Sequence, residues 1–221
     1  MADEQSKKVF ECIIRYKLSG DIEYLRRCET PADEKFELLN IGIEETYVDL
    51  GAYNGDTLVE FLNETSMQFK KLYAMEPDHK NYLKLKRRLY MIGSALLEAY
   101  NCGAWECETT MTFSMRAGRS TKVDTNSVRC REVKMMSVDT MLQGGEATYI
   151  KYDVEGSELP ALNGTKQTIA NYKPKLCVAV YHRNEDMFTL PLLVKSMNKK
   201  YKIYLRHHPY VPDWDTNIYC L

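Results

Sequence analysis

A short glycine-containing segment, residues 49–55, combines residue types that could bind a nucleotide-like ligand. It follows an apolar run and reads Asp49-Leu50-Gly51-Ala52-Tyr53-Asn54-Gly55. Glycine lets the backbone approach a ligand closely and adopt positive φ. A carboxylate before the first glycine repels phosphate and suits a cation, such as the amino group and sulfonium side of S-adenosylmethionine. The spacing also departs from Gly-x-Gly-x-x-Gly, the dinucleotide fingerprint whose helix N-terminus holds a pyrophosphate.

Glu76 supports this interpretation, because it ends the next apolar run, 25 residues after Gly51. An acid at that place can accept hydrogen bonds from both ribose hydroxyls of a bound nucleoside. Alternatively, Asp49 caps a turn and Glu76 is a solvated strand end. We expect the cofactor to contact residues at the ends of the first two strands: Asp49, Gly51, Ala52, Tyr53, Asn54, Gly55, Glu76 and Pro77.

A third apolar run ends in Asn101-Cys102-Gly103. In this arrangement small side chains and backbone lie against an adenine ring, and the Asn101 side chain or the Cys102 backbone amide could read the ring edge. We therefore expect all three residues to bind the cofactor. An ordinary Asn-Cys-Gly turn is the alternative.

The elements that must position these residues alternate between strands and helices from residue 46 onward. Expected strands cover residues 46–50, 71–75, 95–100, 148–152, 176–181, 203–206 and 217–220. Expected helices cover residues 58–63, 79–92, 159–172 and 186–199, with Pro191 in or starting the first turn of the last one. This alternation implies crossover units and a mostly parallel sheet. Ligands bind beyond the carboxyl ends of such strands, which is where the glycine-containing turn lies.

The end of the chain differs, because only residues 207–216 separate the last two expected strands. No helix fits there, so these strands must pair antiparallel or nearly so. The sequence therefore predicts an α/β fold of the class I methyltransferase type: a Rossmann-like, mostly parallel seven-stranded sheet with an antiparallel last strand and helices on both faces. Residues 104–136 should add paired strands. Residues 1–45 should form a helical extension before the domain, residues 46–221.

The second half of the chain carries a more specific motif. Asp153-Val154-Glu155-Gly156-Ser157-Glu158 resembles the Asp-Val-Glu-Gly-x-Glu signature of the FkbM family of S-adenosylmethionine-dependent methyltransferases. The resemblance extends over roughly residues 46–221 and includes the glycine-containing turn, Glu76-Pro77-Asp78 and Tyr181-His182. It implies a class I fold and methyl transfer from S-adenosylmethionine, usually to a hydroxyl of a small molecule or sugar. It does not name the acceptor.

Three residues near the carboxyl ends of the fourth and fifth expected strands could carry the reaction. A hydroxyl acceptor must lose its proton as the new bond forms, and histidine is suited to accept it near neutral pH. We expect His182 to be the general base. Asp153 and Glu155 are candidates for orienting groups or bases, and Asp153 could instead bind the methionine amino group. The alternatives are that Asp153 caps a turn, Glu155 fixes a tight turn and His182 is a hydrogen-bonded strand-end residue.

Other side chains could bind the acceptor. Arg206 and His207 end the sixth expected strand, which should run parallel to the fourth and fifth and reach the same cleft. Arg116 lies in a polar insert, residues 116–126, that could form a lid over the acceptor. Surface positions are the alternative for His207 and Arg116, and a neighbouring carboxylate is the alternative partner for Arg206. We expect no metal, because Tyr181-His182-Arg183-Asn184 stands where a metal-dependent catechol-type enzyme would have an Asp-Asn pair.

The composition excludes several classes of protein. The chain has 221 residues, with 30 basic and 31 acidic residues and a formal net charge of -1. It therefore lacks the positive excess of a nucleic-acid binder, and no apolar run approaches the ~20 residues of a membrane span. The seven cysteines form no Cys-x-x-Cys pair, and no secretion signal is visible, which favours a reduced, cytoplasmic protein. The N-terminal helices could either cover the cofactor or form the contact of a homodimer.

The function predicted is O-methylation of a small molecule or saccharide. N-methylation is a variant, and a methyltransferase-like protein that binds the cofactor without catalysis is an alternative from another class. A nicotinamide-dependent oxidoreductase is disfavoured by the missing third glycine.

Overall fold

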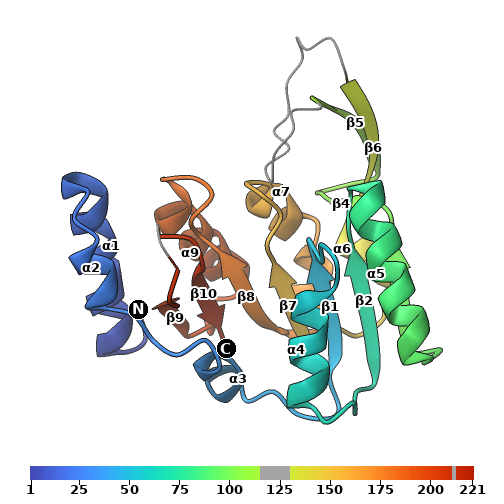
Figure 1. Ribbon diagram of the computed structural model, residues 1–221, viewed down its shortest axis with the longest axis horizontal. Helices are drawn as coiled ribbons and strands as arrows, with labels where there is room; N and C mark the ends of the chain where they lie inside the picture. The colour runs from blue at the N-terminus through green and yellow to red at the C-terminus, as the bar shows by residue number, and fades with distance from the viewer. Residues whose placement is uncertain (115–129, 211–212) are drawn as a thin grey trace.

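The computed structural model describes residues 1–114, 130–210 and 213–221. Its main feature is a seven-stranded sheet with the order β3-β2-β1-β7-β8-β10-β9 (Figure 1). The strands of this sheet are β1 (Thr46–Leu50), β2 (Lys71–Met75), β3 (Leu97–Tyr100), β7 (Tyr149–Tyr152), β8 (Lys175–Ala179), β9 (Ile203–His207) and β10 (Thr216–Cys220). The predicted strands are therefore confirmed to within a few residues at each end.

The directions of the strands also agree with the prediction. Strands β3, β2, β1, β7 and β8 run parallel, whereas β10 is antiparallel to both of its neighbours, β8 and β9. β10 lies between β8 and β9 and is not an outer strand. The loop between β9 and β10 contains no helix in its described residues, so the chain returns directly beside the strand it has just left.

Helices cover both faces of the sheet (Figure 1). They are α1 (Glu4–Ser19), α2 (Glu23–Arg26), α3 (Glu34–Leu39), α4 (Asp56–Glu64), α5 (His79–Ile92), α6 (Val138–Leu142), α7 (Glu158–Asn163), α8 (Lys166–Tyr172) and α9 (Asp186–Met197). Two apolar cores follow from the alternation of side chains along the strands. In β1, Val48 and Leu50 enter the core that includes residues of α7 to α9, and Tyr47 enters the core beneath α4 and α5.

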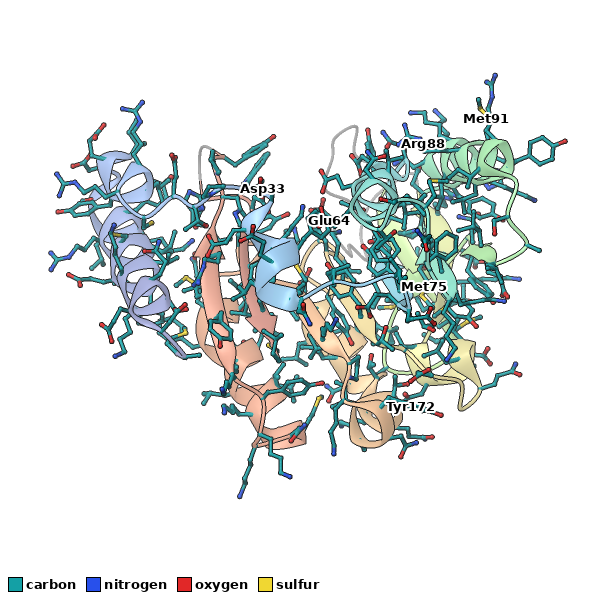
Figure 2. All side chains as sticks on the ribbon, turned by 90° about the horizontal axis from the view of Figure 1, so that it is seen from below. Asp33, Glu64, Met75, Arg88, Met91 and Tyr172 are labelled. Atoms are coloured by element: carbon teal, nitrogen blue, oxygen red, sulfur yellow. The ribbon has the colours of Figure 1, made fainter. Side chains whose placement is uncertain are left out.

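The aromatic residues of the second core stack across neighbouring strands. The ring of Tyr47 lies 4.6 Å from the ring of Tyr149 at an interplanar angle of 9°. Figure 2 shows the contrast with the surface: Met75 lies in the sheet layer, whereas Met91 at the end of α5 points away from the protein.

A second, three-stranded sheet has the order β4-β6-β5 and lies beyond the carboxyl end of β2 (Figure 1). It consists of β4 (Gly103–Ala104), β5 (Thr109–Ser114) and β6 (Cys130–Met136). The antiparallel pairing of β5 with β6 confirms the paired strands expected within residues 104–136. Arg116, expected in the insert between them, lies outside the described residues.

Two helix predictions were wrong in detail. The helix expected over residues 159–172 is divided into α7 and α8 at Gly164 and Thr165. A Cβ at Gly164 would lie 2.1 Å from the carbonyl oxygen of Trp105, and the Asp139 carboxylate accepts hydrogen bonds from the first turn of α8. Pro191 lies inside α9 instead of its first turn, because the helix begins at Asp186. The short helix α6 was not predicted, and α3 lies within residues 1–45, where a helical extension was expected without further bounds.

Candidate cofactor-binding and catalytic site

The glycine-containing turn joins β1 to α4 and packs directly on the loop after β7. Gly51 has φ +84°, and a Cβ there would lie 1.9 Å from the carbonyl oxygen of Asp153. The backbone amides of Gly51 and Ala52 both donate to the carbonyl of Met75 at 3.0 Å. Glycine is therefore required at position 51, because any side chain would separate the ends of β1 and β7.

Asp49 lies beneath this turn and is fully buried. Its carboxylate accepts a hydrogen bond from Thr57 Oγ1 at 2.5 Å and lies 3.5 Å from the ammonium of Lys151. Burial raises the pKa of Asp49, and the charge of Lys151 and the hydrogen bond from Thr57 oppose this rise. The Asp49 side chain therefore links the first turn of α4 to Lys151 and has no exposed surface.

Lys151 lies in this site and was not predicted from the sequence. It lies directly opposite Asp49 in the β1–β7 register, and its Nζ is 3.3 Å from Asp153 Oδ2 and 3.5 Å from Asp49 Oδ1. Burial disfavours the charged amine, but the two carboxylates outweigh it and raise the pKa of Lys151. A lysine in an otherwise apolar strand, Tyr149–Tyr152, was the available signal. The ammonium links the acids at the ends of β1 and β7.

Glu76 follows β2, and only 6% of it is exposed. Its Oε2 accepts from the amide of Tyr53 and its Oε1 from the amide of Asp78, both at 2.8 Å. Burial raises the pKa of Glu76 to about 7, although both backbone hydrogen bonds oppose the rise. The carboxylate is therefore held in one orientation beside the glycine-containing turn, and each oxygen retains a further lone pair.

The residues after β3 contact the backbone of Glu76 and Pro77. The side-chain amide of Asn101 donates to the carbonyls of Glu76 and Pro77, at 2.9 and 3.2 Å. Cys102 is buried, and burial raises the pKa of its thiol to about 12. Gly103 begins β4, where a Cβ would lie 2.7 Å from Met135. The structure thus gives Asn101 a role in fixing the turn at Glu76.

A second cluster forms where β7 and β8 end. His182 Nδ1 lies 2.9 Å from Glu158 Oε1, and His182 Nε2 lies 3.5 Å from both Asp153 Oδ1 and Glu155 Oε2. Burial lowers the pKa of His182, but the hydrogen bond to Glu158 and the charges of the three carboxylates outweigh it and raise the pKa. Glu155 reaches the imidazole because it has a left-handed φ of +54°. The three predicted catalytic residues therefore lie together.

The ionisation of Asp153 fits this cluster. Burial alone would raise its pKa, but the charges of Lys151 and His182 outweigh that effect and lower it. The hydroxyl of Tyr181 also donates to Asp153 Oδ1 at 3.1 Å. The lowered pKa keeps the Asp153 carboxylate ionised. Because 34% of its side chain is exposed, a ligand can reach it.

Arg206 and His207 lie elsewhere, contrary to the expectation that they face the acceptor. Arg206 is buried and forms ion pairs with Asp3 at 2.7 Å and Glu34 at 2.8 Å. The ring of His207 is also buried, with Nδ1 2.9 Å from Thr216 Oγ1. β9 does run in the direction of β8, but it lies four strands from β1, where the N-terminal helices cover it. Arg206 therefore joins these helices to the domain.

Among the residues that the structure describes, no group of three or more His, Cys, Asp and Glu side chains is arranged to hold a metal ion. No helix in this part of the chain has the length and apolar character needed to cross a membrane.

The strand order and the carboxyl-edge site define the class of protein. The sheet, with its inserted antiparallel strand β10, is that of the class I S-adenosylmethionine-dependent methyltransferases. Residues 49–212 match the model of the methyltransferase FkbM domain. This match covers most of the chain, so the protein belongs to the FkbM methyltransferase family.

Solved structures agree with this assignment. The crystal structure of methyltransferase FkbM from Methylobacillus flagellatus KT is 28% identical, with a TM-score of 0.86 over 100% of this chain. The chain spans 56% of the length of that protein. An rRNA methylase from Streptococcus thermophilus shares the fold at 12% identity and a TM-score of 0.54, over 87% of this chain and 95% of its own. A methyltransferase-like protein from Streptococcus mutans in complex with S-adenosylhomocysteine (SAH) also shares the fold. It is 12% identical, with a TM-score of 0.52, over 87% of this chain and 99% of its own. The comparison with curated proteins gives no significant match.

Proposed function

We propose that this protein transfers the methyl group of S-adenosylmethionine to a hydroxyl of a small molecule or saccharide. The observation that carries the proposal is the position of His182. Its imidazole lies among Asp153, Glu155 and Glu158, at the same edge of the sheet as the glycine-containing turn and Glu76. This edge thus combines Glu76, which could bind a nucleoside, Asp153, which could bind a cation, and His182, which could accept a proton.

The residues at this edge fit the cofactor. Glu76 keeps lone pairs for two ribose hydroxyls, because each of its oxygens accepts only one backbone hydrogen bond. The buried Oδ1 of Asn54 in the glycine-containing turn has no hydrogen-bond partner among the described residues, which leaves it an acceptor for a donor of the ligand. Asp153 offers an ionised, partly exposed carboxylate for the methionine ammonium group.

When bound, S-adenosylmethionine supplies an electrophilic methyl carbon on a positively charged sulfur, which departs as a neutral thioether. The protein's tasks are to position the acceptor oxygen in line and to receive its proton. In the proposal, His182 Nε2 accepts the proton of the acceptor hydroxyl as the oxygen–carbon bond forms. Asp153 and Glu155, 3.5 Å from that nitrogen, stabilise the resulting imidazolium.

The presence of a base favours a hydroxyl acceptor over an amine. An alcohol has a pKa far above 7 and must lose its proton during transfer, whereas a neutral amine can be methylated first and lose its proton afterwards. The carboxylates around His182 raise its pKa and therefore strengthen it as a base. This arrangement supports catalysis over binding of the cofactor alone.

Calorimetry and an acceptor screen test the proposal. The protein should bind SAH and should not bind NAD, and a panel of hydroxyl compounds and saccharides should contain one that accepts radiolabelled methyl. His182→Gln should abolish that transfer and leave SAH affinity unchanged. Failure to bind SAH would contradict the proposal. Binding of SAH with no methylated acceptor would favour the alternative of a cofactor-binding protein without catalysis.

A further inference from the structure

Glu158, the first residue of α7, is a buried carboxylate with an unusual set of partners. Only 1% of its side chain is exposed. One oxygen, Oε1, is 2.9 Å from the amide of Val154, 3.4 Å from the amide of Gly156 and 2.9 Å from His182 Nδ1. Glu158 therefore fixes the turn after β7 and contacts the imidazole that follows β8.

The partners of Glu158 determine which imidazole nitrogen carries the proton. A carboxylate only accepts hydrogen bonds, so His182 Nδ1 must be the donor in the contact with Oε1. In the neutral ring, Nε2 is then unprotonated. Nε2 faces Asp153 and Glu155, which are also acceptors, and it has no hydrogen-bond partner among the described residues. Its lone pair is free to accept a proton.

We propose that Glu158 is a positioning residue that holds His182 in the Nδ1–H tautomer and so keeps Nε2 unprotonated where it faces Asp153 and Glu155. This inference rests on the proposed function, in which Nε2 receives the proton of the acceptor hydroxyl. Glu158 itself cannot serve as the base, because it is buried behind the imidazole that it contacts.

The charged groups around His182 come from three segments. Asp153, Glu155 and Glu158 belong to the end of β7 and the start of α7, and the ring of Tyr181 lies 4.1 Å away in the loop after β8. From α9, the carboxyl of Asp186 lies near Glu158. Burial, and then the charge of Glu158, raise the pKa of Asp186 to about 6. Within the described part of the chain, Asp186 forms no hydrogen bond or ion pair with the imidazole. It therefore supplies a matched control, a buried acid that should not set the tautomer.

Nuclear magnetic resonance of the full chain labelled with ¹⁵N-histidine tests the proposal directly. The protein has 4 histidines, and the spectrum of His182→Gln identifies the signals of His182. In the wild type, neutral His182 should carry its proton on Nδ1, with Nε2 unprotonated. Glu158→Gln should lose this preference and lower the pH at which His182 titrates. Asp186→Asn should keep the wild-type tautomer.

A proton on Nε2 in the neutral wild-type ring would overturn the proposal. So would a Glu158→Gln variant that melts at lower temperature but retains the tautomer and the titration midpoint, since Glu158 would then have a structural role alone. Even if Glu158→Gln does not fold, the wild-type spectrum can still overturn the proposal, because it shows which nitrogen carries the proton. SAH calorimetry separates the two levels of inference: loss of SAH binding contradicts the proposed function, whereas SAH binding with the wrong tautomer contradicts only the role of Glu158.

Discussion

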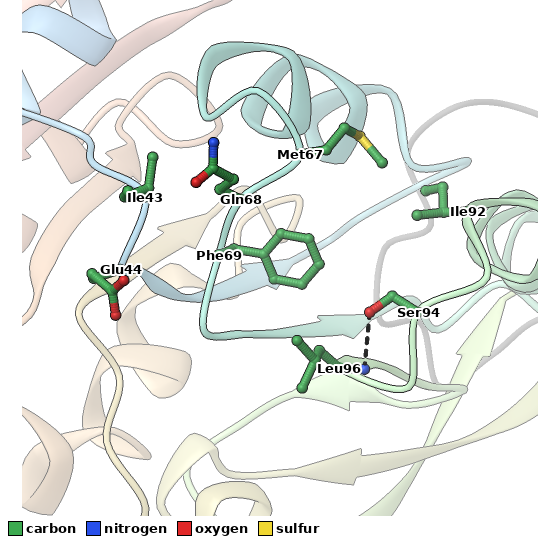
Figure 3. A pocket seen from close by; sticks show the side chains of 8 residues that line it. All are labelled: Ile43, Glu44, Met67, Gln68, Phe69, Ile92, Ser94 and Leu96. Atoms are coloured by element: carbon green, nitrogen blue, oxygen red, sulfur yellow. Dashed lines mark hydrogen bonds between the residues drawn. The ribbon is translucent and has the colours of Figure 1, made fainter.

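The two edges of the sheet differ in what the chain places there. At the carboxyl edge, Lys151 joins two acids and His182 contacts three carboxylates. At the amino edge lies a cavity of about 420 Å³ (Figure 3). Apolar and polar side chains together line it: Ile43, Glu44, Met67, Gln68, Phe69, Ile92, Ser94 and Leu96. The hydrogen bond that Figure 3 shows joins Ser94 to the backbone of Leu96 within one turn.

The cavity and the cluster of ionisable residues therefore lie at opposite edges of the sheet in this fold. Parallel strands bring their carboxyl ends to one edge, so side chains from distant parts of the sequence converge there. The amino edge receives chain returning from the helices, and its ion pairs, such as Lys70 with Glu146 and Lys175 with Glu45, lie outside the lining of the cavity. A site for chemistry is therefore identified here by the convergence of ionisable groups and not by the volume of a cavity.

Gly51→Ala should have the largest effect on stability and binding, because the added Cβ would push apart the turn after β1 and the end of β7. Its Cβ would lie 1.9 Å from the Asp153 carbonyl oxygen, at φ +84°. We expect a loss of about 3 kcal/mol or more in the free energy of unfolding, together with loss of SAH binding. Thermal unfolding and calorimetry measure both quantities.

Gly93→Ala is the matched control, because Gly93 also has positive φ, +71°, but a Cβ there would meet nothing within 4 Å. We expect about 1 kcal/mol of destabilisation and unchanged SAH binding. Equal effects of the two substitutions would show that the close approach at position 51 does not matter.

Arg206→Met should separate stability from binding. The substitution leaves Asp3 and Glu34 without their common partner, and we expect the free energy of unfolding to fall by about 3 kcal/mol. SAH affinity should not change, because this ion pair lies at β9. The exposed pair of Arg15 with Glu11 gives the control Arg15→Met, which should leave the melting temperature unchanged. If a stably folded Arg206→Met variant lost SAH binding, Arg206 would contribute to the ligand site after all.

SAH binding should depend on pH through Glu76, whose folded-state pKa is about 7. Below that pH the carboxyl is protonated and must release its proton to accept both ribose hydroxyls, so affinity should be about tenfold weaker at pH 6 than at pH 8. The raised pKa also means that the unliganded protein loses stability as the pH rises from about 4.5 to about 7. Calorimetry at several pH values measures the first effect and thermal unfolding the second.

Glu76→Gln provides the control for this titration. It should weaken SAH binding about tenfold at pH 8 and remove the dependence of affinity on pH between 6 and 8. If the variant retains the wild-type dependence, another group at the carboxyl edge is responsible for it.

Leu96→Gln should have the smallest effect. Leu96 lines the cavity at the amino edge and is 44% exposed, so the free energy of unfolding should change by less than about 0.5 kcal/mol. SAH affinity should be that of the wild type, as calorimetry can measure. A clear loss of SAH binding would contradict the functional separation of the two edges.

Much of this site was predictable because its residues directly follow apolar strands. Asp49, Glu76, Asp153 and His182 all come at or just after a strand end, and parallel strands carry such positions to one edge. Arg206 also lies near a strand end, yet its side chain binds the N-terminal segment, residues 3–34. Its position along β9 was predictable, but the helices that pack on β9 determine its partners.

The sequence by itself determined the order of strands and helices, the antiparallel return of β10 and the edge at which the acids collect. These follow from local apolar patterns and from the number of residues between strands. Only the tertiary structure decided that Asp49 is buried beneath its turn, that Lys151 joins Asp49 to Asp153 and that Glu158 contacts His182. Burial and the partner of a charged side chain depend on segments far away in the chain, and no local pattern carries that information.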